Sequence, residues 1–144
     1  MRSLLTTAVL LLASPLAAQE IMTITVPETV DDMEFAVESA ILDMGLTIDF
    51  ISYTGAMLAR TGADVGSDVE LYSGATLYNF CSAKVSRQVL EADPANIAYC
   101  PYTIFVYSLP ESPDETIVGH QVYPGASMAP ANALLDAIVK SATE

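Results

Sequence analysis

Two cysteines are the most reactive side chains of this chain, and Cys81 and Cys100 stand about 19 residues apart. An even pair of cysteines in an oxidising compartment predicts a disulfide. Such a bond would stabilise the fold by about 3 kcal/mol, because closing a loop of this length restricts the unfolded chain. The alternative is a thiol or sulfur-compound redox protein that uses the same pair, although the two-residue spacing of thioredoxin-type centres is absent.

His120 is the only histidine of the sequence. It alternates with Val118 in a strand-like pattern, so the two side chains should share one face of a sheet. On a core face His120 would be a buried, hydrogen-bonded residue, and on an open face it would belong to a ligand pocket. A Gly-x-Ser-x-Gly motif is absent, which disfavours a Ser-His-Asp hydrolase. A copper or haem carrier that combines His120 with Met57 or Met128 is a further alternative.

The chain has seven tyrosines and no tryptophan. A tyrosine ring joins a flat apolar surface to a hydroxyl group, so several rings on an exposed sheet face could hold a small ligand. We therefore take Tyr78, Tyr102, Tyr107 and His120 as candidate ligand-binding residues on the open face of a sheet. Rings that are half-buried at the sheet edges are the alternative interpretation of the same pattern.

The sequence contains no motif typical of metal or phosphate binding. The cysteines, histidine and methionines show no spacing typical of metal ligands, and the acidic stretch at residues 64–70 does not match a calcium loop. A glycine-rich phosphate loop is also absent. Acidic residues at positions 31–38 line one side of a predicted helix and are expected to be its solvated face. The sequence therefore predicts no catalytic residue, no metal site and no cofactor.

The N-terminal segment is typical of a signal peptide and is not expected to be part of the fold. Arg2 precedes an apolar run that is shorter than the roughly 20 residues needed to span a bilayer. The run ends at Pro15, and Ala18 is the expected last residue removed. We expect residues 1–18 to be a signal peptide and residues 19–144 to form one exported domain, periplasmic or secreted, without a membrane span after cleavage.

Composition and charge exclude several classes of protein. The 144 residues carry 18 acidic and five basic side chains, a formal net charge of −13, and 52% of them are hydrophobic. Such an acidic chain would be repelled by nucleic-acid phosphates, and so apolar a chain is not typical of disorder. The expected partner is an unknown small molecule or a periplasmic protein, and no nucleic acid.

Hydrophobic periodicity predicts alternating strands and helices in the mature chain. Strands are expected at residues 21–26, 46–53, 75–80, 102–109 and 116–123, and helices at residues 30–44, 56–61, 83–92 and 129–141. The strand at residues 102–109 is apolar on both faces and should be central. The turn-forming residues 110–114 indicate a terminal hairpin, and hence antiparallel pairing. The predicted fold class is α+β, a single domain with a curved, mostly antiparallel sheet and helices packed on one side.

Several short motifs carry a family resemblance. They are Tyr78-Asn79-Phe80-Cys81, the segment from Asp93-Pro94 to Cys100-Pro101, Ile104-x-Val106-Tyr107 and Val118-Gly119. With these motifs, residues 21–142 resemble the exported branch of the domain-of-unknown-function 302 family. The resemblance implies a curved antiparallel sheet with helices on one side, similar to the TATA-binding-protein architecture. That family has no established reaction, so the resemblance assigns no catalytic residue.

These observations together favour a periplasmic, non-catalytic domain that binds a small ligand or serves as an accessory protein. In this interpretation a Cys81–Cys100 disulfide stabilises the domain. The thiol redox protein and the copper or haem carrier remain the alternatives.

Overall fold

Five strands form one open antiparallel sheet in the order β1-β5-β4-β3-β2. They are β1 (Ile21–Val26), β2 (Thr47–Ser52), β3 (Gly74–Cys81), β4 (Tyr102–Leu109) and β5 (Ser112–Gln121). The computed structural model describes residues 20–144, and the predicted signal peptide at residues 1–18 lies outside that range. As the apolar pattern predicts, β4 is the central strand, and the sheet is antiparallel throughout.

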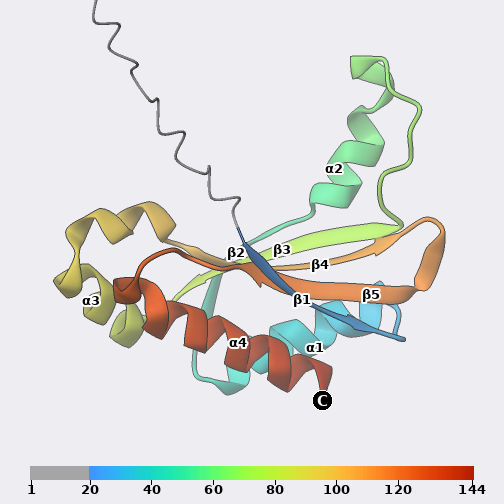
Figure 1. Ribbon diagram of the computed structural model, residues 1–144. Helices are drawn as coiled ribbons and strands as arrows, with labels where there is room; N and C mark the ends of the chain where they lie inside the picture. Colours follow the sequence, from blue (N-terminus) through green and yellow to red (C-terminus); the bar gives the residue numbers. More distant parts are fainter. Residues whose placement is uncertain (1–19) are drawn as a thin grey trace, which may run out of the picture.

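Three helices cover one face of the sheet, which confirms the predicted α+β class (Figure 1). They are α1 (Val30–Asp43), α3 (Ala83–Ala92) and α4 (Ala129–Thr143), with short 3₁₀ turns η2 (Pro94–Tyr99) and η3 (Ala126–Met128). The fourth helix, α2 (Thr54–Thr61), stands on the other side of the sheet and is followed by η1 (Ala63–Val65). In the part of the chain from residue 20 onward, no helix is long and apolar enough to cross a membrane.

Local sequence signals set the ends of the helices. The Thr29 hydroxyl accepts a hydrogen bond from the backbone N–H of Asp32 and caps α1, and Ser82 caps α3 in the same way through Val85. These side chains supply acceptors for N–H groups that have no partner within the helix. Gly45 follows α1 with a φ of +73°, a left-handed conformation that glycine adopts without steric cost.

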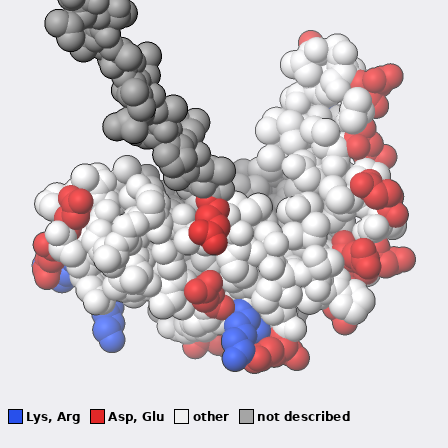
Figure 2. Space-filling view, viewed as in Figure 1, with Lys and Arg blue, Asp and Glu red and all other residues white. Residues whose placement is uncertain are grey.

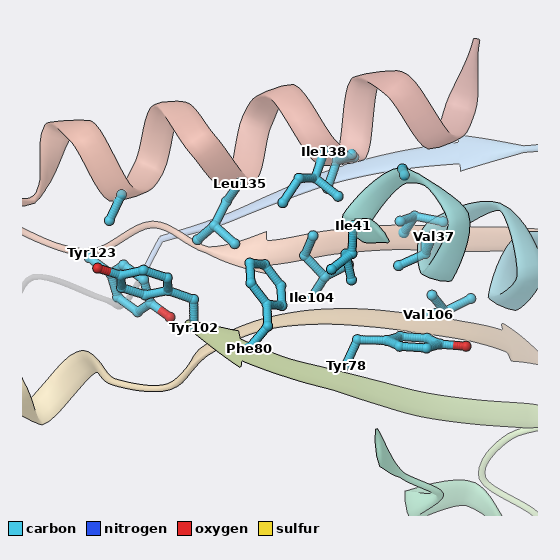
Figure 3. Packing of buried hydrophobic residues seen from close by; sticks show 14 of the residues in the cluster. Val37, Ile41, Tyr78, Phe80, Tyr102, Ile104, Val106, Tyr123, Leu135 and Ile138 are labelled. Atoms are coloured by element: carbon cyan, nitrogen blue, oxygen red, sulfur yellow. The ribbon is translucent and has the colours of Figure 1, made fainter. Parts of the chain in front are cut away.

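The hydrophobic core lies between the sheet and the layer formed by α1 and α4. Leu135 and Ile138 point from α4 toward the sheet, and Val37 and Ile41 approach it from α1 (Figure 3). Phe80 lies beneath these helices and is fully buried. Since burial of each large apolar side chain contributes roughly 1.5–3 kcal/mol, this layer supplies most of the driving force for folding.

The pairing register assigns every strand residue to one of two faces, because successive side chains alternate. Ile104 of β4 pairs with Tyr78 of β3 and with His120 of β5, so these three side chains share the helix-covered face. Phe105 pairs with Leu77 and Gly119 on the opposite face. We call this second face, which α2 covers only in part, the open face.

Candidate functional site

The two cysteines meet at one end of the sheet. Cys81 is the last residue of β3, and Cys100 directly precedes the Pro101–Tyr102 entry into β4. A β-bulge between Ile48 and Phe50 brings Asp49 of the neighbouring strand to the same place. Both cysteines are free thiols in the structure, so it does not contain the predicted Cys81–Cys100 bond.

The environment of Cys81 favours the protonated thiol. Desolvation, the neighbouring Cys100 and the Asp49 carboxylate raise the pKa of Cys81 to about 11. A redox or nucleophilic cysteine needs a lowered pKa, since the thiolate is the reactive form. The helix that Ser82 begins therefore does not activate Cys81 as the redox alternative requires.

His120 is a buried residue of the helix-covered face, one of the two interpretations that the alternation left open. Its Nδ1 lies 2.9 Å from the backbone carbonyl oxygen of Gln121, and its Nε2 lies 2.9 Å from Oδ1 of Asp136 on α4. Both ring nitrogens thus have hydrogen-bond partners, and the contact with Asp136 joins β5 to α4. Met57 lies on α2, on the opposite side of the sheet, so it does not complete a metal site with His120.

We expected Tyr78, Tyr102 and His120 to lie on the open face of the sheet. This prediction is wrong for all three residues. All three side chains point into the core and are at most 2% exposed. The Tyr78 hydroxyl donates to the Glu34 carbonyl oxygen of α1 at 3.0 Å, and the Tyr102 hydroxyl lies 3.4 Å from Ser86 Oγ. The physical reason is that α1, α3 and α4 cover the face these residues share.

Tyr107 is the one candidate ligand-binding residue that the structure places on the open face. Its ring lies 5.5 Å from that of Tyr72 and 6.0 Å from that of Phe105, measured between ring centroids. These rings border an apolar hollow of about 200 Å³ that also includes Leu77. A flat aromatic surface of this kind can contact a small ligand or the body of a larger one.

A larger cleft lies beside the projection that we call the arm, which consists of residues 54–73 and includes α2 and η1. The cleft has a volume of about 700 Å³ and runs from the arm to the first turn of α1. Its floor is the beginning of β3, at residues 74–76. Binding clefts for small molecules in proteins typically measure about 300–1,000 Å³, so this one has the size of a ligand site.

Two glycines allow the elements around the cleft to approach each other closely. A Cβ atom on Gly55 would lie 2.7 Å from the backbone nitrogen of Ala75, so α2 sits on β3 at a distance that only glycine allows. A Cβ atom on Gly74 would lie 2.7 Å from a methyl group of Val30, at the start of α1. The N–H of Ser67 donates to the carbonyl oxygen of Gly62 at 2.9 Å and closes the tip of the arm.

Sequence patterns did not single out the residues that line this cleft. The lining includes Tyr53 and Tyr72, together with Asp31 and Glu34 from the expected solvated face of α1. Figure 2 shows acidic side chains along the outer edge of the arm. The one sequence feature that indicates this region is the glycine-rich, acidic loop between α2 and β3, which is longer than most connections within a domain.

The protein is therefore a single α+β domain with an open antiparallel sheet, three helices on one face, and a cleft between the arm and the start of α1. Within residues 20–144, no three His, Cys, Asp or Glu residues lie close enough to hold a metal ion. The model of the family described as "Domain of unknown function DUF302" matches residues 22–142. The chain therefore belongs to the DUF302 family.

A solved structure of the same family supports the fold. This chain is similar to an uncharacterized conserved DUF302 protein from Bacillus stearothermophilus, with a TM-score of 0.59 and 16% sequence identity. The similarity covers 85% of this chain and 91% of that protein. No curated protein matches the sequence. At this identity the comparison supports the fold alone.

Proposed function

We propose that this DUF302 protein is an exported, non-catalytic domain that binds a small molecule in the cleft beside the arm. The observation that carries the proposal is the cleft of about 700 Å³, beside which α2 and the start of α1 pack closely on β3 at Gly55 and Gly74. A site with preset walls loses little conformational entropy when a ligand enters. Tyr107 extends the apolar surface next to the cleft through its contact with Tyr72.

The proposal can be tested with probes that share one alkyl chain. Octylamine, 1-octanol and octanoate would be titrated into the ¹⁵N-labelled domain, and amide chemical shifts would be recorded. We expect at least one probe to shift the amides of residues 67–76 and of the first turn of α1. Ala59→Trp, which places an indole in the cleft, should abolish these shifts.

Ala137→Trp is the matched control, because Ala137 is also an exposed helical alanine but lies on α4, in the helix layer. It should leave probe binding unchanged. The proposal fails if no probe affects the cleft amides, or if Ala59→Trp and Ala137→Trp behave alike.

We further propose that the protein is periplasmic and that Cys81 and Cys100 oxidise there to a structural disulfide. Two features support this proposal: the signal-peptide pattern of residues 1–18, and the proximity of Cys100 to Cys81, which contributes to the raised pKa of Cys81. An oxidising compartment favours such a bond between adjacent thiols. The bond would join the end of β3 to the beginning of β4.

Protein expressed from the full-length sequence and recovered from a bacterial periplasm is expected to have a denatured mass about 2 Da below that of the same chain after reduction. Cys81→Ser and Cys100→Ser should each lower the free energy of unfolding by up to about 3 kcal/mol, and the double variant should lose no more than either single one. In the reduced domain, alkylation of Cys81 should rise with pH toward a midpoint near 11, because the raised pKa keeps the thiol protonated below it. A Cys81 thiolate that reacts fully at neutral pH would instead support the redox alternative.

A further inference from the structure

Four carboxylates line the cleft beside the arm. Asp31 and Glu34 come from the first turns of α1, and Asp68 and Glu70 come from the returning segment of the arm. No lysine or arginine is among the lining residues, and Arg60 of α2 is not part of the wall. The three ion pairs found within residues 20–144 involve none of the four carboxylates. The cleft therefore carries negative charge that the neighbouring side chains do not neutralise.

The negative charge beside the cleft also affects the pKa of Tyr78, a buried residue next to it. Burial raises the pKa of the Tyr78 hydroxyl, and the negative charges of Glu34 and Glu38 raise it further. Tyr78 lies on the covered side of β3, just behind the start of α1, and donates its hydrogen bond to the Glu34 carbonyl oxygen. The charge of Glu34, a residue of the cleft lining, thus also acts on the buried Tyr78 hydroxyl.

The four carboxylates of the cleft are not arranged to hold a metal ion. A divalent cation needs several oxygen ligands around one point, whereas no three acidic residues converge within the described part of the chain. Separate carboxylates along a cleft can instead meet an extended molecule at several points. The remaining lining is largely apolar and includes Val30, Leu58, Val69 and Leu71.

The two tyrosines of the lining add a preference for cations. Tyr53 lies at the base of α2, and Tyr72 lies on the side of the cleft that faces Tyr107. The face of a tyrosine ring attracts an ammonium group, because the ring carries partial negative charge on its face. Aromatic rings, aliphatic side chains and carboxylates in one cleft together match a molecule with an apolar body and a positively charged end.

We infer that the cleft beside the arm binds an organic cation, an amine with an apolar body. This inference rests on the proposed function and specifies its ligand class. The carboxylates of Asp68 and Glu70 on the arm bind the ammonium group, and Asp31 and Glu34 add negative charge at the α1 end of the cleft. The apolar wall contacts the body of the ligand. The formal net charge of −13 also draws cations toward the protein at low ionic strength.

The three octyl probes isolate the charge of the ligand, because only the head group differs. Octylamine is expected to bind at least ten-fold more tightly than 1-octanol in isothermal titration calorimetry at low salt, and octanoate is expected to bind most weakly. Raising the salt concentration should reduce the advantage of octylamine, since exposed charges are screened. The double variant Asp68→Asn with Glu70→Gln should weaken octylamine binding about ten-fold and leave 1-octanol binding unchanged.

The control is Glu111→Gln with Asp114→Asn, which removes two negative charges from exposed positions in the β4–β5 turn and at the beginning of β5, outside the cleft lining. It should reduce octylamine affinity less than two-fold. Equal binding of all three probes in the cleft would overturn the cation inference and leave the proposed binding function intact. Cleft amides that respond to none of the probes would overturn both.

Discussion

Replacement of Phe80 by alanine is expected to lower the free energy of unfolding by about 3–5 kcal/mol. Phe80 is 0% exposed, and its ring packs edge-on against that of Tyr102, with a centroid distance of 6.4 Å. The residue lies where β3 and β4 meet the helix layer, so the deletion would leave a cavity that rigid neighbours cannot fill (Figure 3). Because domains of this size are stable by only about 5–15 kcal/mol, the loss is a large share of the total.

Urea denaturation measures this effect, and the chain contains a matched control. Phe35 of α1 is 75% exposed, so Phe35→Ala should change the free energy of unfolding by no more than about 0.5 kcal/mol. Comparable losses from Phe80→Ala and Phe35→Ala would show that the core is not packed as described.

Replacement of Gly119 by alanine is expected to loosen β1 from the sheet. A Cβ atom at this position of β5 would collide with the backbone carbonyl oxygen of Met22 in β1 and would lie 2.8 Å from Cζ of Phe105. The Phe105 ring can rotate, but a backbone atom of a paired strand cannot move without breaking the ladder. Overpacking of this kind costs about 1–3 kcal/mol, and we expect a loss at the upper end of that range.

Amide hydrogen exchange distinguishes this strand separation from a general loss of stability. Gly119→Ala should speed exchange in β1 more than in β3 and β4, because only β1 pairs with β5 on that side. Phe105→Ala should not rescue the variant, since the Met22 carbonyl remains in the way. Wild-type stability of Gly119→Ala would contradict the described pairing of β1 with β5.

Periodicity predicted the elements well where they carry one-sided or uniformly apolar patterns. Tyr102–Leu109 carries apolar side chains on both faces, and its predicted central position is confirmed. Thr29, Gly45 and Ser82 mark the helix ends through chemistry that is local to the sequence. The turn-forming residues at 110–114 predicted the hairpin of β4 and β5, which the structure confirms. Strand β5 begins earlier than expected, at Ser112.

The faces of the sheet could not be assigned in the same way. Alternation shows that His120 shares a face with Val118, but it does not show which face the helices cover. Tyr78 and Tyr102 were therefore expected on the wrong face. The short helix α2 carries no information on the side of the sheet where it docks, because that side depends on the contact of Gly55 with Ala75. The cleft arises from this contact and from the path of residues 62–73, so no sequence pattern predicts it.

The most direct test of the central claim, that the cleft beside the arm holds a small molecule, is native mass spectrometry of protein expressed from the full-length sequence and recovered after export. For the wild type and for Ala137→Trp, we expect a native mass above the denatured mass, with the difference lost on denaturation. Ala59→Trp, which fills the cleft, should show no such difference. Native and denatured masses that agree for all three proteins would contradict the account.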